Sequence, residues 1–399
     1  MKRKLSRALI LILVIGAAAC TSAAEEPTPQ PSDPPPSATK APTTTATSQP
    51  TDTPEPIPTQ PPVDLSSFGR LAYVAYAPND VELYLYDDGV GSMQLTDGEG
   101  FSLRPVWSPD GRYLSYFYIP PGADSPDLWV IDFEFGGEAR QVTDGSAGYF
   151  SVPAWMNDSR SLVYWGNDAR FDGVYILSLD VESGEIANLT PDYPKWNSHP
   201  AASPVDARIA FVSDRPDGSS DKIWVMDAAG GRLKLVAGEE GMFWEHSFPA
   251  WSPDGEQLAF YRDSFMAELL GGDDESGLTA GLWVVNVEDG QERLVYEMDT
   301  MLLKEAPVWS PDGRWIVLPR GAADETDLWL ISVEDGEAIQ LSDLPGEETG
   351  VVWSPDSASL LFTHMDARGL VHLYIASLDG SPPLLVFEGQ DVGYAARRP

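Results

Sequence analysis

The sequence predicts an all-β fold, a seven-bladed β-propeller, which follows a signal peptide and a disordered linker. The first observation is the phrase Trp-Ser-Pro-Asp-Gly, which recurs in perfect and altered copies. The six copies begin at Trp107, Trp155, Ala202, Trp251, Trp309 and Trp353. The second observation is their spacing of 48, 47, 49, 58 and 44 residues. A period in this range is typical of propeller blades.

Each copy of the phrase predicts a turn between two strands. In the first copy, Pro109 presets φ for the second position of the turn, and Gly111 accepts a positive φ at its exit. Apolar residues precede this turn, and an alternating run from Tyr113 to Phe117 follows it. The first and second strands of each unit are therefore expected to form a hairpin.

Third and fourth strands follow each hairpin. The third strands are recognised by an apolar run around a Trp: residues 128–132, 223–227, 282–285 and 328–331. Turns such as Asp289-Gly290 and Asp335-Gly336 come next, and then short fourth strands such as residues 140–143 and 339–342. Four short strands joined by turns make one antiparallel blade.

The third observation is the count of third strands, which is seven because residues 83–86 precede the first Trp copy. The first unit begins at Arg70 with its second strand and lacks a first strand. Residues 391–397 have no second strand after them, so we expect them to supply the missing strand and to close the ring. A six-bladed ring is the alternative if the first unit packs elsewhere.

The repeats resemble the WD-like propeller repeats of the TolB type. The resemblance is carried by Pro-x-Trp-Ser-Pro-Asp-Gly and the following Phe strand (residues 249–260) and by Asp-x-x-Trp-x-Met-Asp (residues 221–227). It covers residues 70–390 and implies a propeller. The α/β domain that precedes the propeller in TolB has no counterpart here, so the resemblance does not imply its partnership with the Tol–Pal system.

Residues 1–20 are predicted to be a lipoprotein-type signal peptide. Four basic residues precede a 12-residue apolar stretch, Ala8 to Ala19, which is too short for a permanent membrane helix. The small residues before Cys20 resemble a bacterial lipobox, in which the Cys is lipidated; ordinary cleavage after Ala-x-Ala is the alternative. Cys20 is the only Cys in the chain, so no intrachain disulfide is expected.

Residues 21–63 are rich in Pro, Thr and Ser and are predicted to be a disordered tether, ahead of a propeller at 64–399. Residues 1–63 hold five basic and five acidic residues, so the propeller carries the whole net charge of −37, with 20 basic and 57 acidic residues. This charge argues against nucleic acid as a partner and against direct contact with anionic lipid. The protein is expected to be an extracytoplasmic monomer that reaches the membrane through its lipid anchor only.

A binding site is expected on the face of the ring that carries the irregular loops between second and third strands and between blades. Aromatic side chains with few polar groups there suit a peptide, a protein or a glycan. The candidate ligand-binding residues are Arg104, Tyr149, Trp196, His199, Trp244, His246, Lys304 and Glu305. Packing between blades is the alternative role for the aromatic members.

Catalytic chemistry is not evident in the sequence. Gly-x-Ser-x-Gly, Walker A, Rossmann and His-Glu-x-x-His motifs are absent, and no cofactor or metal is expected. Asp214, Asp217 and Asp221 share one loop, but their spacing is not that of an EF-hand and favours a turn. The alternative function comes from oligogalacturonate lyases, which are similar propellers with a histidine-bound metal; it would use His199, His246 and His364. Since His199 and His246 are not at equivalent repeat positions, we favour a non-catalytic binding protein.

Overall fold

The computed structural model describes residues 63–77, 80–123, 125–134, 136–143, 147–149, 151–168, 173–193, 196–216, 220–238, 245–263, 280–298, 305–322, 325–387 and 392–398. The chain divides into two units, Met1–Glu55 and Pro56–Pro399, and every described residue belongs to the second. The predicted signal peptide, with Cys20, and nearly all of the predicted linker lie outside the described residues. Across the described ranges, no helix has the length and hydropathy that a membrane span requires.

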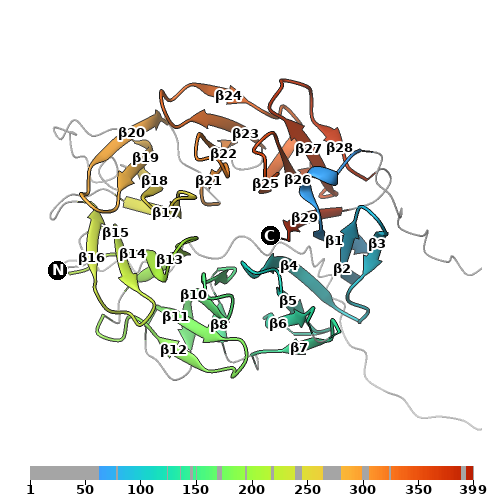
Figure 1. Ribbon diagram of the computed structural model, residues 1–399, viewed down its shortest axis with the longest axis horizontal. Helices are drawn as coiled ribbons and strands as arrows, with labels where there is room; N and C mark the ends of the chain where they lie inside the picture. The colour runs from blue at the N-terminus through green and yellow to red at the C-terminus, as the bar shows by residue number, and fades with distance from the viewer. Residues whose placement is uncertain are drawn as a thin grey trace, which may run out of the picture. The chain divides into compact units, whose positions relative to one another are not determined.

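Strands dominate the described residues, as the all-β prediction requires, and one short 3-10 helix, η1 (Ser66–Phe68), precedes them. Within Pro56–Pro399 the strands form groups that follow one another around a ring (Figure 1), and the pairing within each group is antiparallel. In two places a single parallel bridge joins successive groups, Val81 with Phe101 and Thr326 with Glu347. One group consists of β4 (Phe101–Trp107), β5 (Tyr113–Ile119), β6 (Asp127–Asp132) and β7 (Ala139–Gln141). Another consists of β13 (Asn197–Ala202), β14 (Arg208–Ser213), β15 (Lys222–Asp227) and β16 (Lys234–Ala237). Between them, the short strands β8 (Ala147–Tyr149) and β9 (Ala154–Trp155) both pair with β10 (Ser161–Asp168), which is followed by β11 (Tyr175–Asp180) and β12 (Ile186–Asn188).

The second half of the ring repeats this pattern. Its groups are β17 (Glu245–Trp251), β18 (Gln257–Asp263), β19 (Gly281–Asn286) and β20 (Glu292–Glu297); β21 (Val308–Trp309), β22 (Trp315–Ala322), β23 (Glu325–Ser332) and β24 (Ala338–Gln340); and β25 (Gly346–Trp353), β26 (Ser359–Asp366), β27 (Val371–Ser377) and β28 (Leu384–Leu385). In Figure 1, strands such as β4, β13, β17 and β25 lie toward the centre of the ring, whereas β7, β16, β20 and β24 lie at its rim.

The two ends of this unit meet in one group. Strand β29 (Val392–Arg397) pairs antiparallel with β1 (Leu71–Ala77), which continues through β2 (Asp80–Asp87) to β3 (Gly91–Gln94). The register places Leu71 opposite Arg397 and Ala75 opposite Val392. The predicted pairing of the C-terminal segment with the first unit is therefore confirmed. We call this junction of β29 and β1 the seam.

The hydrophobic core is divided into clusters that lie between successive groups. One cluster joins Ala72, Val74 and Leu83 of the first group to Trp107 and Leu114 of the next. Another joins Leu71 and Tyr73 to Leu361, Leu373 and Phe387, which come from the last group. Because each group buries both of its faces, its central strands are continuously buried rather than alternately buried and exposed, as in the burial pattern of β14.

In four of the groups, the Trp of the repeated phrase connects the group to the one before it. The indole nitrogen Nε1 of Trp155 donates a hydrogen bond to the carbonyl of Val106 at 3.1 Å, and that of Trp251 donates to Ala201 at 2.9 Å. The same bond runs from Trp309 to Ala250 at 3.1 Å. At the seam, Trp107 donates to the carbonyl of Ala396, also at 3.1 Å. The repeated phrase therefore forms a turn within its own group and, through its Trp, a hydrogen bond to the preceding group.

The turn within the phrase is fixed by its Ser, Asp and Gly. Ser252 Oγ donates to Asp254 Oδ1 at 2.6 Å, and Gly255 follows with a φ of +70°. Where the Gly is replaced, Ser159 and Ser357 keep a positive φ of 56° and 60°. Each of these two serines accepts a hydrogen bond from a backbone N–H of the preceding group's turn, at 3.0 and 3.1 Å. This bond offsets part of the strain that a side chain incurs in the left-handed region.

Candidate functional site

Four of the inner strands carry the same backbone irregularity at the same position. Arg104, His199, Phe248 and Gly350 each lie three residues before the last residue of their strand, and each has a positive φ, of 54°, 47°, 51° and 64°. The pairing of each strand with its neighbour shifts register at this point. We call these four residues the inner bulge set. A bulge redirects the side chain that it carries, and strained non-Gly residues concentrate at functional sites.

The local sequence explains three of the four bulges. A Pro directly follows Arg104, His199 and Phe248, and it has no N–H to donate to the neighbouring strand. The ladder is interrupted there, so an extra residue is accommodated in the first strand. At Gly350 the next residue is Val, and Gly itself adopts the positive φ without a Cβ to oppose it.

Arg104 and Glu305 are brought together from opposite parts of the chain. Nη1 of Arg104 lies 3.6 Å from Oε1 of Glu305, and the two side chains are 32% and 25% exposed. The other oxygen of Glu305, Oε2, accepts the backbone N–H of Gly350 at 2.9 Å. One carboxylate thus links two members of the inner bulge set, and both charged groups remain partly open to solvent.

An aromatic cluster surrounds the other two members. The rings of His199 and Phe248 lie 4.2 Å apart between centroids, and Trp165 lies 5.2 Å from His199. Trp196 packs edge-on against Trp165 at 5.6 Å. Aromatic faces of this kind can accept a sugar ring or an apolar side chain.

The electrostatics of this cluster keep His199 neutral. Burial lowers the pKa of His199 to about 4, because the charged imidazolium would lose its hydration. Its Nδ1 lies 3.0 Å from the hydroxyl of Ser198. At neutral pH the ring therefore offers an aromatic surface and a hydrogen-bonding nitrogen, but no charge.

The other two histidines of the lyase alternative, of which His246 is also a predicted ligand-binding residue, are held inside the fold. His246 is 3% exposed; its Nδ1 donates to the carbonyl of Asp221 at 2.7 Å, and its Nε2 accepts from Nε of Arg262 at 3.1 Å. His364 is 5% exposed and lies 2.8 Å from the buried carboxylate of Glu348. His246 is therefore engaged by protein groups at both nitrogens, which the sequence did not indicate.

The three histidines of the lyase alternative are not brought into one metal group. Phe248, not His246, occupies the position equivalent to His199, in agreement with the unequal spacing from Pro noted in the sequence. Within the described ranges, no cluster of three His, Cys, Asp or Glu side chains is arranged to hold a metal ion.

Several predicted residues lie where the structure describes no side chain. Trp244 and Lys304 lie outside the described residues, as does Asp217. Tyr149 belongs to β8, where only the backbone is described. Of the eight candidates, the structure therefore brings together Arg104 with Glu305, and Trp196 with His199 through Trp165.

Phe248 and Gly350 were missed by the sequence prediction. The available signal for Phe248 was its place directly before the Pro of Pro-x-Trp, which Arg104 and His199 share. A comparison of this one repeat position across the copies would have grouped the three residues without any structure.

The ring of antiparallel groups, joined at its seam and carrying redirected side chains on its inner strands, defines the molecule as a β-propeller with a candidate site on the inner strands. The model of the TolB beta propeller domain matches residues 66–280, which is more than half of the chain. The chain belongs to the TolB beta propeller domain family.

The relatives that this chain matches in sequence include an uncharacterized protein and a peptidase. An uncharacterized protein of Agrobacterium fabrum is 29% identical over 187 residues, which is 45% of this chain and 61% of that protein. Dipeptidyl-peptidase 5 of Porphyromonas gingivalis is 24% identical over 340 residues, which is 70% of this chain and 47% of the peptidase. The chain thus spans less than two thirds of either relative.

A solved oligogalacturonate lyase in complex with manganese is similar in fold. It superposes with a TM-score of 0.59 at 19% identity, over 78% of this chain and 86% of the lyase. At this identity the likeness shows the fold alone.

Proposed function

We propose that this protein is a non-catalytic, extracytoplasmic lipoprotein whose propeller has seven blades and binds a protein, peptide or glycan through the inner bulge set. The observation that carries the proposal is the placement of Arg104, His199 and Phe248 at equivalent strained positions of the inner strands, where Arg104 forms a half-buried pair with Glu305 and the rings of His199 and Phe248 pack together. A seven-bladed count is supported by the successive strand groups and by the cores that lie between them. Strained backbone is retained where it positions side chains for a partner.

Charge and chain layout support the remaining parts of the proposal. A net charge of −37 disfavours nucleic acid and anionic lipid as direct partners and favours a soluble monomer. Membership of the TolB beta propeller family supports an envelope location. The lyase alternative has no support from a metal group in the described part of the chain.

The binding site is tested with peptide and glycan arrays probed with the purified wild-type protein and with Arg104→Gln. Any ligand that binds across the inner strands should lose about tenfold in affinity in the variant, since a charge-assisted hydrogen bond is lost. Stability should change little, because a half-exposed ion pair contributes about 0–1 kcal/mol.

Two control variants separate binding from folding. Arg368→Gln removes an exposed arginine that pairs with Asp366, and it should leave affinity unchanged. Gly255→Val should lower the melting temperature and leave the affinity unchanged, because φ is +70° there and a Cβ would lie 2.3 Å from a methyl carbon of Val205.

Absence of any bound peptide or glycan, or equal affinities for wild type and Arg104→Gln, would contradict the proposed site. Release of unsaturated uronate from oligogalacturonate in the presence of manganese would support the lyase instead.

Anchoring is tested at Cys20. Metabolic labelling with a fatty-acid analogue should mark the wild-type protein and not Cys20→Ser, because the thiol is the group that would be alkylated. The variant should also leave the membrane fraction. Equal labelling of the two proteins, or wild-type protein found only in the medium, argues for ordinary cleavage.

A further inference from the structure

The joint between the last strand group and the first lacks the Trp that most first strands of the ring carry. A carbonyl that accepts the indole N–H of the next group lies directly before the first residue of its own phrase, as Val106 precedes Trp107 and accepts from Trp155. At the seam the accepting carbonyl belongs to Ala396, and the residue after it is Arg397. Arg397 therefore occupies the position of the Trp on β29. We call the interface between the group of β25–β28 and the group of β29 and β1–β3 the closing joint.

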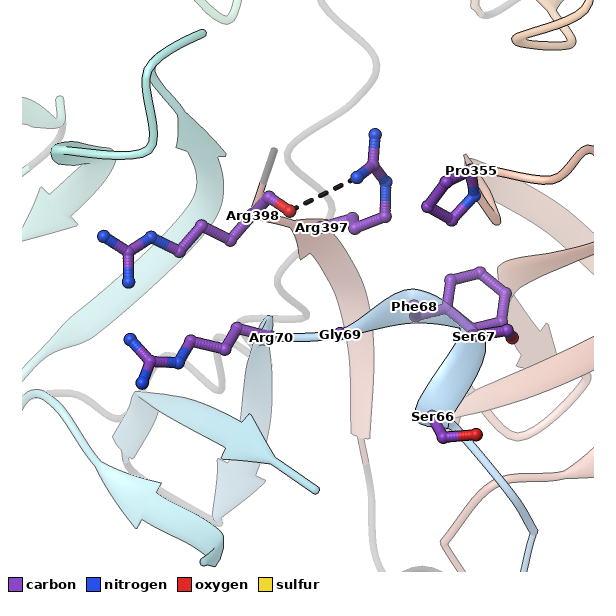
Figure 2. Close-up of a pocket in the computed structure, with 8 residues that line it drawn as sticks. All are labelled: Ser66, Ser67, Phe68, Gly69, Arg70, Pro355, Arg397 and Arg398. Carbon is purple, nitrogen blue, oxygen red and sulfur yellow. Dashed lines mark hydrogen bonds between the residues drawn. The ribbon is translucent and has the colours of Figure 1, made fainter. Parts of the chain in front are cut away.

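Strand β29 brings little apolar volume to the closing joint. A Cβ at Gly393 would lie 2.4 Å from a methyl carbon of Val371, so the backbone of this strand lies close against the last group. The side chain of Arg397 is directed toward Pro355 (Figure 2). An open pocket of about 490 Å³ remains there, lined by residues 66–70, Pro355, Arg397 and Arg398. The first strand therefore does not fill this joint by itself.

Residues 63–69, which precede β1, supply apolar side chains to the closing joint, and we call them the strap. Leu65 is 0% exposed and Phe68 is 1% exposed. Both belong to a core cluster that combines residues of the last group with residues of the first: Leu361, Leu373, Val386 and Phe387, and Leu71, Tyr73, Ala75 and Tyr86. Within this cluster the rings of Tyr73 and Phe387 stack with their centroids 5.0 Å apart. The strap thus buries two large side chains where the two groups meet.

The strap is shaped by hydrogen bonds between its own residues. Oδ1 of Asp64 accepts the N–H of Ser66 at 2.9 Å, and the carbonyl of Leu65 accepts the N–H of Phe68 at 2.9 Å. Gly69 follows with a φ of +66° and turns the chain into β1, as Figure 2 shows. Because these bonds are local, the strap contacts the two groups through its buried apolar side chains. It can therefore detach without unpairing a strand.

We propose that the strap fastens the closing joint in place of the missing Trp, and that its release opens this joint while β29 stays paired with β1. Burial of two large apolar side chains favours the closed joint. Under the proposed lipid anchoring, the tether of residues 21–63 continues into the strap, so tension on the anchor would reach this fastener before any strand. The fastening itself does not rest on that anchoring, because it follows from the contacts of residues 63–69 alone.

Hydroxyl-radical footprinting of the purified full chain tests the proposal, because it measures which buried side chains become accessible to solvent. In Phe68→Ala, oxidation of Tyr73 and Phe387 should rise at least about tenfold over the wild type, since loss of the ring destabilises the fastened strap. Amide hydrogen exchange across residues 392–397 should stay as slow as in the wild type, because β29 remains paired with β1. Tyr73 and Phe387 that stay protected in the variant, or a loss of β29 protection together with theirs, would overturn the proposal.

Phe260→Ala is the matched control. Phe260 is also 0% exposed, and it lies in a core between two groups that a Trp still joins, through the bond from Trp251 to Ala201. Oxidation of Trp251 should therefore stay at its wild-type level in this variant. An equal gain in oxidation at both joints would show that a cavity alone exposes its neighbours, and the strap would then have no fastening role.

Leu65→Ala keeps the proposal testable should Phe68→Ala fail to fold. It removes the smaller of the two buried side chains of the strap, and it should expose Tyr73 and Phe387 to a lesser extent. Wild-type protection of both rings in a folded Leu65→Ala protein would contradict the proposal.

Discussion

Deletion of residues 391–399 is expected to lower the free energy of unfolding by at least about 4 kcal/mol, through lost apolar burial and through polar groups left without partners. The deletion removes β29, and β1 then becomes an open edge. The indole N–H of Trp107 loses the carbonyl of Ala396, and the carbonyl of Arg70 loses the N–H of Arg398. Urea unfolding followed by Trp fluorescence measures the effect.

A synthetic peptide of residues 391–399 should restore much of the lost stability when it is added to the truncated protein. The matched control peptide carries Gly393→Val, because a Cβ at this buried glycine would lie 2.4 Å from a methyl carbon of Val371. It should rescue poorly. An unchanged unfolding midpoint in the truncated protein would contradict closure of the ring by β29.

Acidification from pH 6.5 to pH 4 is expected to cost about 3 kcal/mol of stability through His246 alone. Burial, and next the charge of Arg262, lower the pKa of His246 to about 3. The hydrogen bonds require the same neutral ring, since Nε2 accepts from an arginine that is always protonated. Below the ordinary pKa of 6.5 the unfolded chain binds a proton at this histidine that the native state does not bind. Stability therefore falls as the pH falls through this window.

His246→Gln isolates this contribution. A glutamine can donate to the carbonyl of Asp221 and accept from Arg262, but it does not titrate. Free energies of unfolding of the two proteins should be similar at pH 7.5, and the variant should lose about 3 kcal/mol less by pH 4. Buried carboxyls such as Glu348, whose pKa is raised by burial, oppose the trend equally in both proteins. Parallel pH profiles would show that His246 is not the group responsible.

The strand pattern could be predicted because each strand depends on its near neighbours in the sequence. Trp251 to Gly255 specify their own turn through a Ser–Asp hydrogen bond and a glycine with positive φ. The third strand predicted at 223–227 is found at Lys222–Asp227, one residue longer. Fourth strands ended earlier than predicted, as at Ala139–Gln141, since an outer strand pairs on one side only.

The candidate site could be predicted only in part. Arg104 and Glu305 were both expected to bind ligand, but nothing in the sequence indicated that residues so far apart would pair. His246 was expected at the same site because it lies near the start of a first strand. In the structure it is buried, and Arg262 of the neighbouring strand donates a hydrogen bond to its ring. A polar residue at the end of a strand has the same local sequence signal whether it is solvated or buried.

The sequence by itself determined the repeat, its hairpins and the need for a C-terminal strand, because these follow from turn chemistry and from the rule that a sheet edge must be paired. Only the tertiary structure decided which side chains face one another across the ring. The pairing of Arg104 with Glu305 and the packing of His199 against Phe248 depend on contacts between residues far apart in the chain. Such contacts follow from ring closure, which fixes distances that no local pattern encodes.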